Sequence, residues 1–445
     1  MISIGRSVRL VWRRFQPQHQ SLVAIMVWPL LYYLKQGQDV FQWSALLQYG
    51  LLLYLLVLAS RQDGWTALRS GSLKYIWILF FCFVLYMTIA TLANSPIFLN
   101  GIVGWIKHVQ FVPLLLVCSA IGPRPDLLRR WFIPYLFVLF IVAALPVLLS
   151  AITESSRLTP LLYTGPGLKY PGLYVRYKFV FNSPNTLAVF LANAVVFCFF
   201  SLSSQLRRAR VAIPVLGMSL LGVYLVLLTL SRRTWVILPV VFVLGIGLQR
   251  GIRRRVWLVL GVGLLFALVL YLLLMASVDE WGPMVKRLSS LLVFKDGVSL
   301  QQTGPLHIRL IFYEWIIGYL QRPVEWAFGL GAGTIGFAVR NYLSSGYASV
   351  DGYYAVLLGE YGSIGLLLYL ALIVVILSRL ARAILQRRLP LDDEGIVVAC
   401  LTSSFLVLLA GVVGNSNTGF PNGLYMWSFL GIGLNLSEGA GRTQA

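Results

Sequence analysis

The amino-acid sequence predicts an all-α polytopic membrane protein of about twelve transmembrane helices, with two long loops on the outer side of the membrane. Three observations predict this class. The 445 residues are 58% hydrophobic and 11% charged, and the mean hydropathy is +0.81. Apolar runs of roughly 20 residues recur along the chain, which is the length that crosses the hydrocarbon core of a bilayer. Lys and Arg gather in the short connections between these runs.

The length of each apolar run and the charges that flank it place the predicted spans. In chain order they lie near 21–35, 41–60, 73–94, 101–121, 131–152, 184–203, 211–230, 234–249, 256–276, 353–378, 395–414 and 423–437. The chain then divides into an N-terminal block of nine helices over 1–276, a large outer loop over 277–352 and a C-terminal block of three helices over 353–445. A second long outer loop at 153–183 interrupts the N-terminal block.

Every second connection is basic, which gives the orientation because positive loops stay in the cytoplasm during insertion. Lys and Arg cluster in the N-terminal segment and then near 61–74, 124–130, 207–210, 253–255 and 379–388. Counting from a cytoplasmic N-terminus places all of these clusters inside, together with both chain termini. The first apolar run lacks a small-residue cleavage site, so we expect an uncleaved span. The net charge of +21 then largely reflects topology.

Several classes of partner and chemistry are not expected from this composition. The charges are spread over short turns and do not form one basic face with stacking aromatics, which argues against nucleic acid. Cys82, Cys118, Cys198 and Cys400 all fall inside predicted spans, with neither a disulfide framework nor a metal-binding spacing. The outer connections carry no tight Asp/Glu cluster, so we expect no metal and no cofactor.

We expect the chemistry in the two long outer connections, because long loops on a membrane scaffold tend to be functional. The larger one contains a weakly amphipathic run at 306–320 with apolar residues at helical spacing. Pro323 follows as a stop signal, and Gly329, Gly331 and Gly333 predict a flexible segment before the chain returns to the membrane.

Arg232 and Arg233 lie at the outer ends of the seventh and eighth spans, where positive charge opposes insertion and needs compensation. One interpretation is contact with lipid headgroups. The other is an anion site, because a guanidinium offers a rigid fork of donors that matches diphosphate oxygens. Arg309, Arg176 and Lys178 in the long outer loops can join such a site. Several cations beside a bilayer suggest a lipid diphosphate as the ligand.

Four stretches, taken in order, match a known pattern. The first, Phe181-Asn182-Ser183-Pro184-Asn185, opens the sixth span. The second, Leu230-Ser231-Arg232-Arg233, contains the arginine pair. The third consists of Arg309, Trp315, Pro323 and Gly329-Leu330-Gly331. The fourth is Asp351-Gly352 and, after nine residues that include Glu360, Gly362-Ser363-Ile364-Gly365. In this order and topology the chain resembles the O-antigen ligase and polymerase family, bacterial membrane enzymes that move glycans from undecaprenyl diphosphate.

The resemblance implies glycosyl transfer with undecaprenyl diphosphate as the leaving group and inversion at the anomeric carbon. Arg232 and Arg309 would stabilise the charge that develops on the diphosphate as the anomeric bond breaks. The residues expected to bind the diphosphate or the glycan are Arg233, Arg176, Lys178, His307, Asn185 and Glu360.

Asp351 departs from the family pattern, because the ligases typically carry a histidine at this position. A carboxylate can also activate or orient the acceptor hydroxyl as a general base. His307, two residues before Arg309, is the alternative base. Asp351 equally fits as the N-cap of the tenth span, and the two roles are compatible.

Glu360 is predicted about two and a half turns below Asp351, inside the apolar zone. An intramembrane carboxylate is usually paired with a cation or a polar group. An arginine such as Arg232 is one expected partner, and a direct part in catalysis is the alternative. Lys107 and His108 in the fourth span are similarly unusual, either lining a lipid groove or lying near a span end.

These inferences together predict a metal-independent glycosyltransferase of the bacterial inner membrane with its active site facing the periplasm. The donor is an undecaprenyl-diphosphate-linked glycan and the acceptor a second glycan lipid. Asp351 in place of histidine favours a polymerase of O-antigen or exopolysaccharide, for which a chain-length regulator would be a further partner. The alternative is a ligase that transfers the glycan to lipid A core. A transporter of lipid-linked oligosaccharides is the alternative from another class; the long outer loops and the lack of an inverted repeat stand against it.

Overall fold

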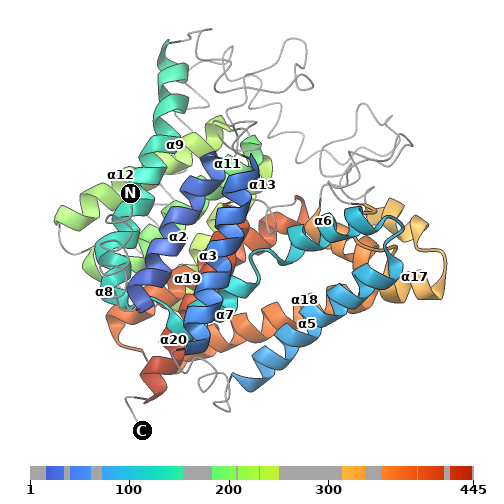
Figure 1. Ribbon diagram of the computed structural model, residues 1–445. Helices are drawn as coiled ribbons and strands as arrows, with labels where there is room; N and C mark the ends of the chain where they lie inside the picture. Colours follow the sequence, from blue (N-terminus) through green and yellow to red (C-terminus); the bar gives the residue numbers. More distant parts are fainter. Residues whose placement is uncertain are drawn as a thin grey trace, which may run out of the picture.

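The computed structural model describes residues 17–34, 41–61, 73–153, 183–206, 209–229, 231–249, 313–335, 352–387, 389–414 and 421–442. Within these ranges the chain consists of helices joined by short turns, without any strand. The predicted all-α class is therefore confirmed for this part of the chain, which Figure 1 shows as coloured ribbons.

The helices begin and end close to the predicted limits. In chain order they are α2 (Pro17–Leu34), α3 (Phe41–Arg61), α5 (Lys74–Asn94), α6 (Phe98–Val109), α7 (Pro113–Ile121), α8 (Pro125–Leu127), α9 (Ile133–Thr153), α11 (Pro184–Ser201), α12 (Ala209–Leu228), α13 (Arg232–Leu248), α17 (Pro323–Phe328), α18 (Tyr353–Leu385), α19 (Leu391–Val412) and α20 (Asn422–Arg442). A π-helical turn, Leu128–Phe132, joins α8 to α9, and residues 313–319 form one further short helix.

Six of the described helical segments are long and apolar enough to cross a membrane. They are Lys74–Asn94, Phe98–Ile121, Pro125–Leu145, Ala209–Val226, Tyr353–Leu385 and Leu391–Val412. Three shorter apolar helices, Tyr49–Ser60, Asn185–Ser201 and Arg233–Leu248, accompany them. Repeated long apolar helices of this kind are those of an integral membrane protein.

The predicted span at 256–276 lies outside the described residues. Helices occupy the other predicted spans, with two differences. The predicted span at 101–121 consists of two helices, α6 and α7, because the chain turns at 110–112 before Pro113, whose missing N–H cannot continue the ladder. The span predicted to end at residue 378 continues as α18 to Leu385. Arg379 on this extension pairs with Glu438 of α20, which fixes the added turns against a neighbouring helix.

The helices α11, α19 and α20 form the centre of the bundle. α19 packs against α11, α13, α18 and α20, and α20 also packs against α7. Within the apolar window of α19, 83% of residues are buried, compared with 39% for α5. α5 therefore lies at the periphery, where it runs along α18, and α17 lies near one end of this pair (Figure 1).

Aromatic pairs show the relative directions of the helices. Phe190 stacks on Tyr425 and Phe197 on Phe429, so α11 and α20 run parallel. Tyr369 packs against Phe83, whereas Tyr361 lies at Thr91, so α18 and α5 run antiparallel. These directions match the alternation that the sequence predicts for the third, sixth, tenth and twelfth spans.

Candidate functional site

The third and fourth sequence motifs meet at a break in α18. Gly362 has φ 67° and ψ −172°, so the helix is interrupted between Tyr361 and Ser363. The glycine-rich segment that follows α17 fills the space beside this break. Leu330 N donates to Gly359 O at 2.8 Å, and Gly331 N donates to Glu360 O at 3.1 Å. Segments about thirty residues apart in the sequence are thus held together through backbone groups.

Two glycines make this close approach possible. A Cβ on Gly329 would lie 2.4 Å from the carbonyl of Glu360, and a Cβ on Gly362 would lie 2.3 Å from Ala327 O. Both residues also have positive φ, a conformation that L side chains adopt only at a cost. The flexible segment expected from the sequence is therefore a docked one in the described range 329–335.

The same segment is fixed to the junction between α5 and α6. Tyr86 donates its hydroxyl proton to Tyr361 O at 2.8 Å and lies 3.2 Å from Ala327 O. Ser95 Oγ donates to Ala332 O at 3.2 Å. Gly104 of α6 lies so close that its Cβ would be 2.6 Å from Gly333 N. Three helices, α5, α6 and α18, thus surround one short glycine-rich segment.

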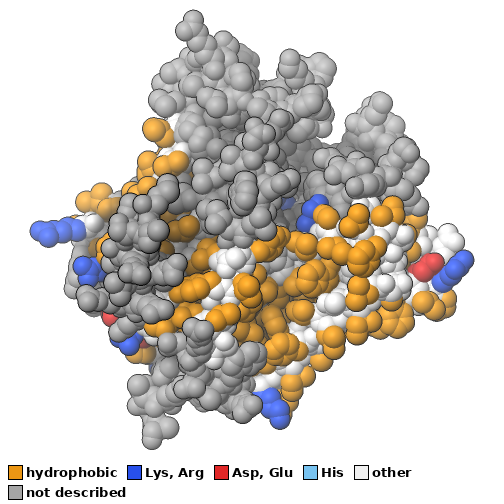
Figure 2. Space-filling view, in the orientation of Figure 1, with side chains coloured by type: hydrophobic (Ala, Val, Ile, Leu, Met, Phe, Trp, Pro, Cys, Tyr) orange, Lys and Arg blue, Asp and Glu red, His pale blue; other side chains and the backbone are white. Residues whose placement is uncertain are grey.

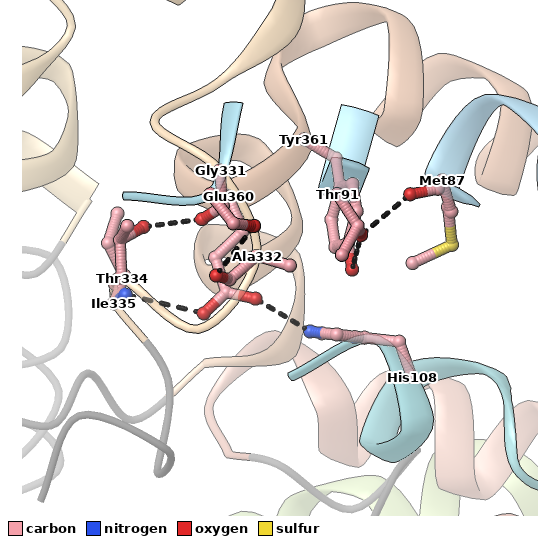
Figure 3. A network of polar contacts seen from close by, with 10 residues as sticks. Met87, Thr91, His108, Gly331, Ala332, Thr334, Ile335, Glu360 and Tyr361 are labelled. Atoms are coloured by element: carbon pink, nitrogen blue, oxygen red, sulfur yellow. Dashed lines mark hydrogen bonds and ion pairs between the residues drawn. The ribbon is translucent and has the colours of Figure 1, made fainter. Parts of the chain in front are cut away.

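A buried hydrogen-bonded pair lies beneath this segment. Figure 3 shows the Glu360 carboxylate between His108 and the backbone of Ile335. His108 Nε2 lies 3.0 Å from Glu360 Oε2, and Ile335 N donates to Glu360 Oε1 at 3.3 Å. The side chains of Glu360 and His108 are only 1% and 6% exposed. Tyr353 and Tyr361 pack against the His108 ring, with centroids at 5.6 and 5.4 Å.

This pair bears on one expectation and gives His108 a role. Of the two expectations for Glu360, the structural partnership has a physical counterpart. The side chain of Arg232, the expected partner, lies outside the described residues, and the partner that the structure describes is His108. The reason is helical spacing: His108 follows Gly104 by one turn, so the contact of Gly104 with Gly333 brings the imidazole to Glu360. Both carboxylate oxygens accept a protein hydrogen bond, so Glu360 positions residues 330–335 and α18 relative to one another.

Arg233 lies at the C-terminal end of α19. Its Nη1 donates to Ala410 O at 3.1 Å, one of the last four carbonyls of the helix, where a cation is favoured. A Cβ on Gly414 would lie 1.6 Å from Arg233 Nη1, so the guanidinium lies directly on this glycine. Gly414 O in turn accepts from Tyr353 N at 3.2 Å. The arginine motif is thereby linked to the first residue of α18.

Tyr313, the first residue of helix 313–319, reaches the same place. Its hydroxyl donates to Val412 O at 2.8 Å, and it lies near Gly352. Burial raises the pKa of the Tyr313 phenol, so the hydroxyl stays protonated and remains a donor. The end of α19, the start of α18 and the start of helix 313–319 therefore form one junction.

Replacing Arg233 with alanine is expected to lower the free energy of unfolding by about 1.5 kcal/mol. This value is the lower end of the range for hydrogen bonds to charged groups, because the side chain is partly exposed. Denaturant unfolding in detergent, followed by tryptophan fluorescence, measures the change. Arg210→Ala on the exposed first turn of α12 is the control, expected within about 0.5 kcal/mol of the parent. Equal stability of the two variants would contradict the assigned contact.

The first motif serves as a helix start. Ser183 Oγ accepts from Thr186 N at 3.2 Å, and Pro184 takes the first helical position, where its missing N–H costs nothing. Asn185 lies half-buried in this first turn. Asn422 Nδ2 donates to Thr186 O at 3.2 Å, which ties the start of α11 to the start of α20.

The other expected site residues divide into two groups. Arg309, His307, Arg176, Lys178 and Asp351 lie outside the described residues. Arg232 begins α13, where only its backbone is described. Among the described residues, no three His, Cys, Asp or Glu side chains are grouped so as to hold a metal ion.

Sequence reasoning missed two hydroxyl groups. Tyr86 of α5 bonds to the backbone of α17 and α18, and Ser95, which follows α5, bonds to the glycine-rich segment. Nothing in the sequence distinguishes these two from other polar residues of an apolar run. His108 did carry a signal, because a histidine next to a lysine is rare inside a span.

The fold and this junction define an all-helical integral membrane protein with a glycine-rich segment docked into a broken helix. A scan of protein-family models finds no match for this chain, and no curated protein matches it either.

Proposed function

We propose that the protein is a glycosyltransferase of the bacterial inner membrane that uses an undecaprenyl-diphosphate-linked glycan as donor at the periplasmic face. The proposal includes about twelve spans with both termini in the cytoplasm, two long periplasmic loops, and a polymerase of O-antigen or exopolysaccharide as the particular activity. It rests on the resemblance of the four motifs to the O-antigen ligase and polymerase family.

One structural observation supports it most. The described parts of the second, third and fourth motifs converge on the first two turns of α18: Arg233 through Gly414 and Tyr353, and the glycine segment through Gly359 and Glu360. Asp351 precedes the first residue of this helix by two positions, and Arg232 directly precedes Arg233. Motifs that share one reaction are expected to meet in this way, whereas separate capping motifs need not.

The proposed reaction is one displacement. The acceptor hydroxyl oxygen attacks the anomeric carbon, the bond from that carbon to the diphosphate breaks, and undecaprenyl diphosphate leaves with the electron pair. Asp351 takes the hydroxyl proton as general base. Arg232 and Arg309 stabilise the charge that develops on the diphosphate, a role in which preorganised donors contribute strongly.

Purified protein in detergent tests this function. It is incubated with synthetic undecaprenyl-diphosphate repeat unit alone, and separately with a lipid A core acceptor added, and the products are separated on a gel. A ladder without the second acceptor is the expected result and identifies a polymerase. Product that forms only with lipid A core identifies a ligase. If neither lipid is consumed and the donor crosses the bilayer of reconstituted vesicles, the enzyme proposal fails and transport replaces it.

Arg232→Lys is expected to lose nearly as much transfer activity as Arg232→Ala. A lysine keeps the charge but lacks the bidentate fork that the diphosphate oxygens require. Rates of product formation for the two variants, at matched expression, measure this. Wild-type activity of the lysine variant would instead support contact with lipid headgroups.

A further inference from the structure

Helix α17 lies well below the outer end of α5. Its last residue, Phe328, stacks on Tyr86 with ring centroids 6.5 Å apart, and Ala327 O lies 3.2 Å from the Tyr86 hydroxyl. α5 has 21 residues, which at about 1.5 Å per residue equals about one hydrocarbon thickness. Tyr86 precedes the end of α5 at Asn94 by eight residues, or about 12 Å along the helix axis.

The tenth predicted span gives an independent estimate of the same depth. Gly362 follows the first residue of α18 by nine residues, or about 13 Å. It lies against Ala327 O, because a Cβ added at Gly362 would meet this oxygen. Helix 313–319 lies higher, because Tyr313 lies beside Gly352, just before α18, and Ile316 belongs to one buried cluster with Ala355 in the first turn of α18. The chain therefore descends from helix 313–319 to the end of α17 and rises again along the glycine segment to Gly333 at α6.

Three of the six residues of α17 are large apolar side chains that are exposed. Val324 is 66% exposed, Trp326 38% and Phe328 43%. On α5, Leu85 and Ile89, which flank Tyr86 along the helix, are also exposed, and Figure 2 shows apolar side chains extending over this part of the molecule towards α17. The apolar surface of α17 is thus continuous with that of a helix long and apolar enough to cross the membrane.

Polar groups in this segment are arranged as a lipid environment requires. Non-helical backbone at membrane depth is tolerated only where protein satisfies it. Here Leu330 N, Gly331 N and Ala332 O all have protein partners. The charged residues Arg322 and Glu325 lie at the start of α17, with Arg322 82% exposed, which is where the chain would enter from water.

We propose that residues 313–335 form a re-entrant hairpin whose helix α17 presents its exposed apolar side chains to the acyl chains of the outer leaflet. This inference depends on α5 and α18 crossing the membrane and is independent of glycosyl transfer. It changes the expectation that 277–352 is a loop outside the membrane, because part of it would be inserted beside the junction at α18.

Site-directed spin labelling tests the proposal. Single cysteines replace Val324 and Trp326 in a chain whose four native cysteines have been changed to serine or alanine, and the labelled full-length protein is placed in phosphatidylcholine nanodiscs. Collision rates of each nitroxide with oxygen, which concentrates in acyl chains, and with a water-soluble nickel complex give its environment. Leu85→Cys is the lipid-facing control and Arg322→Cys the water-facing control.

The expected result is that labels at 324 and 326 resemble the Leu85 control, with more oxygen and less nickel contact than the label at 322. Nickel contact equal to that at 322, while the Leu85 label reports lipid, would overturn the proposal. Protection from both reagents would mean that protein covers α17, and would overturn it as well. A variant is used only if it still inserts into the membrane and elutes as a monodisperse protein. Positions 324 and 326 both lie on the surface and provide independent readings.

Discussion

Replacing Glu360 with alanine is expected to lower the free energy of unfolding by about 3–5 kcal/mol, the range for removing one member of a buried ionisable pair. The variant would leave His108 Nε2 and Ile335 N buried next to a space that the carboxylate fills. Denaturant unfolding in detergent, followed by tryptophan fluorescence, measures the loss. The control is Glu314→Ala, which removes an exposed carboxylate from helix 313–319 and is expected to change stability by less than about 0.5 kcal/mol.

A double-mutant cycle with His108→Ala isolates the contact. Residues that share a hydrogen bond show coupling energies of about 0.5–3 kcal/mol, whereas distant residues are additive. We expect coupling in this range between positions 108 and 360. Additive single-variant effects would contradict the assigned pair, and an unaffected Glu360→Ala variant would contradict its structural importance.

The second large effect is expected for Gly362→Ala. The substitution adds a Cβ at φ 67°, which costs about 1–3 kcal/mol by itself, and the new atom would lie 2.3 Å from Ala327 O. Either α17 separates from α18 or the break in α18 closes, so we expect a loss of stability and, under the proposed function, a loss of donor turnover. Unfolding and transfer assays on the same preparation measure both.

Gly318→Ala is the matched control for this variant. Gly318 lies in helix 313–319 of the same hairpin, and a Cβ there would meet no atom within 4 Å. In a helix interior, alanine is favoured over glycine by about 1 kcal/mol, so the control should be as stable as the parent or more so. If Gly362→Ala behaves like Gly318→Ala, the docked arrangement is wrong.

The helices could be predicted because their signal is local. A run such as 73–94 is apolar for the length of a bilayer whatever its neighbours are, and α5 covers it almost residue for residue. The break in α18 could not be predicted, because a glycine inside an apolar run has several structural explanations. Only its contact with Ala327, some 35 residues earlier, shows that it admits another segment.

The candidate site could be predicted only in part, for the same reason. Glu360, Lys107 and His108 are each conspicuous as ionisable residues within spans, but the pairing of Glu360 with His108 depends on how α6 packs against the glycine segment. Arg233 was expected at an anion site because positive charge is disfavoured at the outer side. Its contact with the last turn of α19 supplies a compensating partner that no sequence spacing reveals.

The most direct test of the central claim is the release of undecaprenyl diphosphate from a synthetic lipid-linked repeat unit, measured by chromatography for the purified wild type and for Arg309→Ala. The account predicts release by the wild type that persists in EDTA, and at most background release by an Arg309→Ala protein that is folded and membrane-inserted. Failure of the well-folded wild type to release undecaprenyl diphosphate, with acceptor present, would contradict the claim that this protein transfers glycans from a lipid diphosphate.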